Sequence, residues 1–200
     1  MKDPYNVIIT GVGGQGNVLA ARMLGNIMAG RGYKVTIGET FGASQRGGSV
    51  MSHLRISENT VFSPQIPKGQ ADLVVALEPI ESIRVMAGYG NSSVKVLSNT
   101  RPIHPVGVIC GEQNYPSIDD VKRNLSGLCG EMYFIDATDE ALKLGHFILG
   151  NVMMIGAVAG LGVLPFDESD FEKVFRGNVP DSKIDVNIAA FRKGAEMVKG

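Results

Sequence analysis

The stretch Asn6-Val7-Ile8-Ile9-Thr10-Gly11-Val12-Gly13-Gly14-Gln15-Gly16 joins an apolar run to a turn rich in glycine. The run is β-branched and carries no charge, a pattern typical of a strand buried on both faces, so we expect it at the centre of a sheet. Apolar residues then recur at helical spacing from Val18 to Met28, and residues 34–38 form a second apolar strand pattern. These residues predict a Rossmann-like first βαβ unit.

The rest of the chain continues to alternate between strand and helix patterns. Strands are predicted at 49–56, 72–77, 94–98 and 131–135, and helices at 79–87, 117–125 and 138–161, the last with a break near residue 145. We therefore predict an α/β fold, doubly wound, with a mostly parallel sheet that helices cover on both faces.

The last forty residues are helical in pattern. One helix is predicted at 165–175, where Ser169 and Glu172 stand at capping-box spacing, and a longer one at 182–199. We expect residues 1–200 to form a single domain, with an α/β core over 1–163 and a helical tail over 164–200. The apolar stripe of the tail favours association and leaves a homodimer open.

Composition excludes several classes of function. Nineteen Lys and Arg balance 20 Asp and Glu, so the net charge of -1 offers no general attraction to nucleic acid or to an anionic membrane. The two cysteines, Cys110 and Cys129, form no CxxC pair, and we expect each to be a small buried residue rather than a metal ligand. Without a signal peptide, this sparse use of cysteine favours the cytoplasm.

Residues 147–166 carry no charge and could be mistaken for a membrane span. Several glycines and Pro165 interrupt the segment, so we expect a buried helix over 151–161 and no membrane association. Gly156 and Gly160 would let another backbone lie against this helix.

The glycine turn is the first candidate site. Gly11, Gly13, Gly14, Gln15 and Gly16 follow a predicted strand and open a predicted helix, where backbone N–H groups can approach an anion. Glu39, 23 residues after Gly16, stands near the offset at which an acid holds a ribose hydroxyl. A tight strand–helix turn explains the same glycines equally well, and we expect the Gln15 side chain to face a ligand or partner.

The second candidate site follows the second predicted strand. Gln45, Arg46, Gly47 and Gly48 place a guanidinium, which suits carboxylate or phosphate, beside two glycines that allow close backbone approach. In a doubly wound sheet this loop should lie beside the glycine turn, at the carboxyl edge of the strands.

Three motifs together resemble one family: Gly11–Gly16, the Gln45-Arg46-Gly47-Gly48-Ser49-Val50 segment, and Gly150–Ala157. The chain is similar to the gamma-type subunits of 2-oxoacid:ferredoxin oxidoreductases, and within them to the beta subunit of indolepyruvate ferredoxin oxidoreductase. Pyruvate and 2-oxoglutarate members usually carry a Tyr-Gly-Pro-Glu-like stretch before Arg-Gly-Gly where this chain has Phe41-Gly42-Ala43-Ser44-Gln45, which favours the indolepyruvate type.

The resemblance implies a subunit of an enzyme complex, with no cofactor bound by this chain alone and the isolated chain inactive. Thiamine diphosphate, iron–sulfur clusters and CoA would belong to the complex, with an alpha subunit as partner and ferredoxin as electron acceptor. The reaction implied is oxidative decarboxylation of a 2-oxoacid to an acyl-CoA. Gln45 and Arg46 would then contribute near the partner's active site, and the glycines would contact an anion or the partner. The alternative is a free-standing dinucleotide- or nucleotide-binding module.

The other polar candidates favour structural roles. His53, His104 and His146 have no paired nucleophile in the sequence, so we expect hydrogen-bonded structural histidines. Asn151 is the polar residue inside the apolar helix, and we expect it to bond main chain or to reach a subunit interface.

Overall fold

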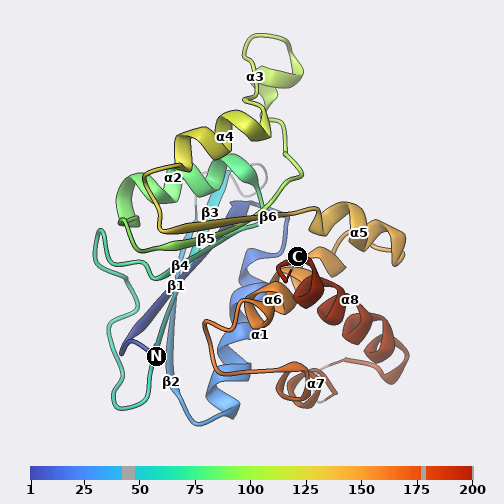
Figure 1. The fold of residues 1–200 in the computed structure, drawn as a ribbon. Coiled ribbons are helices and arrows are strands. Elements are labelled where there is room, and N and C mark those ends of the chain that lie inside the picture. The colour runs from blue at the N-terminus through green and yellow to red at the C-terminus, as the bar shows by residue number, and fades with distance from the viewer. Residues whose placement is uncertain (42–47, 177–178, 200) are drawn as a thin grey trace.

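The computed structural model describes residues 1–41, 48–176 and 179–199. Strands and helices alternate along most of the chain, and the helices gather at its end (Figure 1). The strands are β1 (Tyr5–Val12), β2 (Lys34–Phe41), β3 (Ser49–Ser57), β4 (Leu73–Ala76), β5 (Lys95–Asn99) and β6 (Glu131–Ile135). The helices are α1 (Asn17–Gly30), α2 (Pro79–Tyr89), α3 (Val106–Ile109), α4 (Ile118–Leu125), α5 (Ala137–Lys143), α6 (Leu149–Gly160), α7 (Glu168–Arg176) and α8 (Ile184–Met197), with a short 3-10 turn at Asp181–Lys183.

The six strands form one sheet in the order β2-β3-β1-β4-β5-β6. The strands β1, β4, β5 and β6 are parallel, whereas β3 runs antiparallel to both of its neighbours. The first predicted strand is central as expected, and all eight residues of β1 are buried. The two strands of the predicted βαβ unit run in the same direction, but β3 lies between them and pairs with both.

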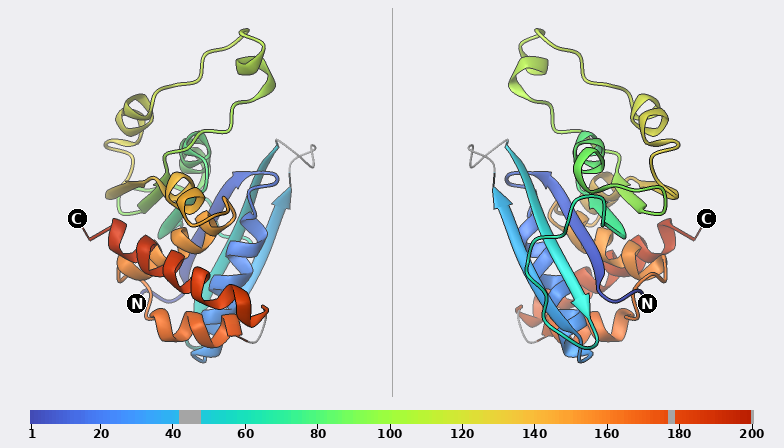
Figure 2. Two further views of the ribbon diagram at one scale, coloured as in Figure 1. Left: turned by 90° about the vertical axis from the view of Figure 1, so that its right-hand side faces the viewer. Right: turned by 90° about the vertical axis from the view of Figure 1, so that its left-hand side faces the viewer.

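Helices cover both faces of the sheet, which confirms the doubly wound prediction (Figures 1 and 2). Successive residues of a strand point to opposite faces, and on β1 the side chains of Val7 and Ile9 enter one core while Ile8 enters the other. The larger core lies under α1, α6, α7 and α8, and the smaller one lies under α2 and α4.

The helix α6 is buried, and backbone contact with α8 explains its glycines at 156 and 160. A Cβ added at Gly156 would lie 2.0 Å from the carbonyl oxygen of Phe191, and one at Gly194 would lie 1.9 Å from that of Met153. The expected close approach of another backbone is confirmed, and the backbone is that of the tail. None of the helices within the described ranges is long and apolar enough to cross a bilayer.

The start of α7 corrects the predicted capping box. The Asp167 side chain accepts hydrogen bonds from the N–H groups of Ser169 and Asp170, at 2.8 and 3.2 Å, and Asp170 accepts one from the Asp167 N–H. Glu172 instead pairs with Arg176 one turn later. A carboxylate two residues ahead of Ser169 therefore takes the capping position.

Candidate functional site

The glycine turn lies at the carboxyl edge of β1, where α1 begins. Gly14 and Gly16 adopt φ values of 102° and 86°, a left-handed conformation that favours glycine. The Gly13 N–H donates to the carbonyl oxygen of Gly48 at 2.8 Å, so the two candidate motifs meet where Gly48 leads into β3. Gln45, Arg46 and Gly47 of the second motif lie outside the described residues.

The Gln15 side chain bonds the protein's own main chain. Its Oε1 accepts from the Val12 N–H at 2.7 Å, and its Nε2 donates to the Leu77 carbonyl at 2.9 Å. The amide therefore links the ends of β1 and β4. Its hydrogen-bonding groups are used within the chain, whereas we expected the side chain to face a ligand or partner. Asn151 reaches the same turn from α6 and donates to the Gln15 carbonyl at 2.8 Å, which confirms the expected bond to main chain.

Glu39 is poorly placed to hold a ribose beside the glycine turn. It lies on β2, which is separated from β1 by β3, or by two strand spacings of about 4.8 Å each. Its carboxylate instead faces Arg22 on α1, with 4.0 Å between Oε1 and Nε. The sequence offset between Gly16 and Glu39 could not reveal an inserted antiparallel strand.

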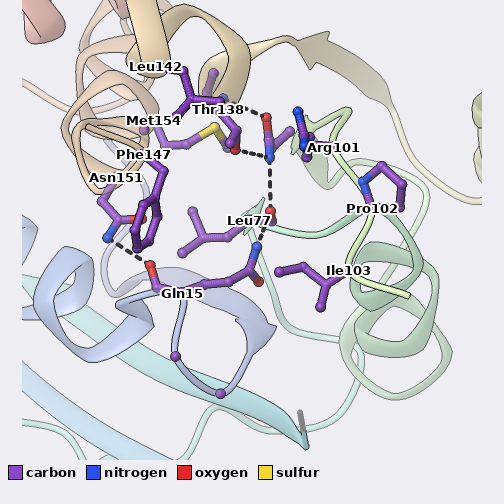
Figure 3. Close-up of a pocket in the computed structure, with 15 residues that line it drawn as sticks. Gln15, Leu77, Arg101, Pro102, Ile103, Thr138, Leu142, Phe147, Asn151 and Met154 are labelled. Atoms are coloured by element: carbon purple, nitrogen blue, oxygen red, sulfur yellow. Dashed lines mark hydrogen bonds between the residues drawn. The ribbon is translucent and has the colours of Figure 1, made fainter. Parts of the chain in front are cut away.

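A cavity of about 600 Å³ opens on one side of the glycine turn (Figure 3). Leu77, Ile103, Leu142, Phe147 and Met154 form its apolar wall, and Gly13, Gly14, Gln15 and Asn151 form its floor. We call this space the first cavity.

The polar side chains around the first cavity are engaged within the chain. The Asn99 amide donates to the Leu77 carbonyl and to the Thr138 hydroxyl, at 3.1 and 2.9 Å, and Arg101 pairs with Asp139 at 2.6 Å. Pockets that bind small polar ligands usually direct a few polar groups at them. This cavity offers mainly apolar surface, which suits packing against another macromolecule.

A second cavity of about 390 Å³ lies between Val12, α2 and the residues after β5, and it shares Ile103 with the first cavity. It contains two carboxylates, Glu78 and Glu81, which are only 2% and 4% exposed. Glu81 accepts from the Ser49 hydroxyl at 2.5 Å and pairs with Arg84 at 3.1 Å. Burial raises the pKa of Glu78. Glu78 also caps α2 by accepting from the Glu81 N–H.

Large apolar side chains are exposed around the glycine turn. Leu142, Phe147 and Ile148 are each at least one-third exposed, and Phe147 reaches 51%. Leu142 and Phe147 line the first cavity, and Ile148 lies against Gly16. We call these three residues the edge patch. Clusters of exposed apolar side chains on natural proteins mark interaction sites.

The histidines occupy structural positions. The buried His53 accepts from the Ile66 N–H at 3.4 Å and packs edge-on against Tyr89, and His146 accepts from the Ile148 N–H at 3.1 Å. His104 packs against Tyr115. Within the described ranges, His, Cys, Asp and Glu side chains do not gather in groups of three or more that could hold a metal ion.

Comparison with known proteins gives a consistent family assignment. Residues 6–197 match the family model described as pyruvate ferredoxin/flavodoxin oxidoreductase. The indolepyruvate oxidoreductase subunit IorB of Thermococcus kodakarensis is 39% identical over 98% of this chain and 96% of that protein.

Solved structures share the fold. The pyruvate oxidoreductase subunit PORC of Thermotoga maritima superposes with a TM-score of 0.73 at 23% identity, over 98% of this chain and 97% of that one. The 2-oxoglutarate:ferredoxin oxidoreductase of Magnetococcus marinus gives a TM-score of 0.74 at 18% identity, over 100% of this chain but 32% of that longer one.

Proposed function

The chain belongs to the pyruvate ferredoxin/flavodoxin oxidoreductase family, and from this premise we propose that it is the small subunit of a 2-oxoacid:ferredoxin oxidoreductase of the indolepyruvate type. The IorB relative matches this chain along nearly its full length, which supports the indolepyruvate assignment. The complex would convert a 2-oxoacid and CoA to an acyl-CoA and CO2. A proton would be released, and ferredoxin would accept the electron pair.

The observation that carries the proposal is the edge patch beside the first cavity. Its apolar residues are exposed although the chain has a complete core of its own, and the polar groups near it are bonded internally. This surface is suited to contact with a companion subunit, which corresponds to the alpha subunit of the complex. The Magnetococcus chain supports this arrangement, since a domain of the same fold there occupies about one-third of a longer polypeptide.

The cofactors of the reaction would reside in the companion subunit. An iron–sulfur cluster commonly needs four cysteine thiolates, whereas this chain has two cysteines. Thiamine diphosphate, when bound there, would supply the carbanion chemistry of decarboxylation. This chain would contribute its carboxyl edge, with Gly11, Gly13, Gly14, Gln15, Gly16, Gly47 and Gly48 against the companion or an anion.

Arg46 and Gln45 are the side chains proposed to act nearest to the companion's active site. The guanidinium of Arg46 would bind a carboxylate of the substrate or a phosphate of CoA. The alternative, a free-standing nucleotide-binding module, loses its ribose contact because Glu39 is separated from the turn by β3.

Reconstitution with the companion subunit tests the proposal. We expect the isolated chain to be colourless and inactive, and the complex to oxidise indolepyruvate with CoA and ferredoxin. Arg46→Ala should lower kcat or raise the KM for CoA, whereas Arg176→Ala, which removes only a pair within α7, should leave both unchanged. A chain that binds NAD or FAD with micromolar affinity and ignores the companion would contradict the proposal.

A further inference from the structure

Residues 102–115 form a loop, which we call the arm, that projects from the body of the protein between β5 and α4 (Figures 1 and 2). The helix α3 lies at its outer end. Val106 and Ile109 on α3 are 74% and 72% exposed, among the highest values for large apolar side chains within the described residues. Cys110 is exposed beside them, so the expectation of a buried cysteine there was wrong.

The outer end of the arm is braced by its own main chain. The Gly107 carbonyl accepts from the N–H groups of Glu112 and Gln113, at 2.8 and 3.0 Å, and the Pro105 carbonyl accepts from the Val108 and Ile109 N–H groups. These bonds close α3 into a compact turn. Val106 and Ile109 are thus presented on a defined backbone.

The base of the arm is fixed by one buried carboxylate. Glu78 Oε1 accepts from the Ile103 N–H at 3.3 Å, where the arm leaves the body, and from the Tyr115 hydroxyl, where it returns. The His104 and Tyr115 rings also pack against each other, with 5.2 Å between their centroids. Both ends of the arm are therefore held to the start of α2. Such preorganisation reduces the ordering cost that a flexible loop would incur on binding.

The composition of the arm is unusual for an exposed loop. Residues 102–111 contain no Asp, Glu, Lys or Arg, and solvent-facing loops are generally polar. Glu112 is the one Asp, Glu, Lys or Arg side chain of the arm, and the two β-branched side chains on α3 match an apolar groove. Arm and edge patch also share a border, because Ile103 at the base of the arm lines the first cavity together with Leu142 and Phe147.

We propose that the arm is a preformed docking element whose Val106 and Ile109 side chains insert into an uncharged apolar groove of the companion subunit. This inference rests on the proposed function, since it names the companion of the complex as the occupant. Continuity with the edge patch favours that partner, because one subunit covering the patch would meet the arm as well. Glu78 and Tyr115 would then be positioning residues for the contact.

The test measures binding of the full-length chain to the purified companion subunit. The double variant Val106→Asp/Ile109→Asp should raise the Kd at least 100-fold while leaving the unfolding midpoint of the isolated chain unchanged. The matched control is Val61→Asp. Val61 is a similarly exposed apolar residue that follows the carboxyl end of β3, the end of that strand away from the glycine turn. Tyr115→Phe, which removes only the hydroxyl bonded to Glu78, should raise the Kd several-fold and speed hydrogen exchange in the arm.

The outcomes separate this inference from the proposed function. If the wild-type chain does not bind the companion, the proposed function and the docking element are both wrong. If the wild type binds and the double variant binds equally well, the complex stands and the arm is not its docking element. If the isolated wild-type chain is a dimer that the double variant dissociates, the occupant is a second copy, and the assignment to the companion is overturned.

Discussion

Two glycine-rich regions of this protein differ in whether the space beside a glycine is already filled by the chain itself. In the α6–α8 contact, the α-hydrogens of Gly156 and Gly194 face backbone of the opposite helix, and the contact is completed within the chain. At the glycine turn, a Cβ added to Gly14 would meet nothing within 4 Å, and a cavity and exposed apolar side chains lie beside it. Glycine thus indicates where close approach is possible, whereas the surroundings show whether the approaching group is already present.

The largest effect on stability is expected at the contact between α6 and α8. Gly156→Ala should lower the free energy of unfolding by about 3 kcal/mol, because the new methyl group would overlap the backbone of Phe191 and force α8 away. Urea unfolding measures the change. Gly30→Ala is the control, since a Cβ there meets nothing within 4 Å, and it should be neutral or stabilising by up to about 1 kcal/mol. Equal effects of the two changes would contradict the packing described for α6 and α8.

The second prediction concerns the open region. Leu142→Asp/Phe147→Asp should weaken binding to the companion by about 100-fold, or about 2.7 kcal/mol, because the charges would have to be desolvated at the contact. Stability of the isolated chain should change by less than about 1 kcal/mol, since both side chains are about half exposed. Leu128→Asp, an exposed apolar position before β6, serves as control. Unchanged binding in the double variant would show that the edge patch stays free in the complex.

The third prediction concerns the link between the two regions. Asn151 lies on α6 and bonds the Gln15 carbonyl, so Asn151→Ala should leave that part-buried acceptor without this donor and cost about 1 to 2 kcal/mol. Asn124→Ala removes a bond of similar length from an exposed amide to the Asp120 carbonyl and should cost less than about 0.5 kcal/mol. Thermal unfolding of the two variants compares them. A smaller loss in the Asn151 variant than in the Asn124 variant would exclude a structural link through this amide.

The smallest effect is a pH dependence outside both regions. Burial lowers the pKa of His53 below its ordinary value of 6.5. As the pH falls through 6.5, His53 of the unfolded chain takes up a proton, whereas His53 of the folded chain does not. The free energy of unfolding is therefore highest above pH 6.5 and declines below it. His53→Gln should flatten this decline between pH 7 and pH 5 in urea unfolding. A wild-type curve that rises with acidity over this range would contradict the assignment.

The sequence predicted the parts of the fold that depend on local patterns. Periodicity located β1 at the centre of the sheet and α6 in the core, because a long apolar run without charges is buried whatever it packs against. It did not reveal that β3 separates β1 from β2, since strand order depends on pairing between residues far apart in the chain. That insertion also removed the ribose role expected of Glu39.

The site was predicted in outline only. The meeting of Gly48 with the glycine turn followed from the rule that ligand loops gather at the carboxyl edge of a doubly wound sheet. That rule does not predict the direction of the Gln15 amide, because the Leu77 carbonyl to which the amide donates is 62 residues away in the sequence. The contacts of Glu78 could not be predicted either, since nothing local in the sequence relates it to Ile103 or Tyr115.

The exposed thiol at the outer end of the arm has a practical consequence. Cys129 is partly buried, its pKa is raised by that burial, and its sulfur donates to the Leu125 carbonyl, so a maleimide dye at neutral pH should modify Cys110 first. A fluorophore placed there without any mutation would report by its emission colour when water leaves its surroundings. The native polypeptide thus carries its own attachment point for following assembly in real time.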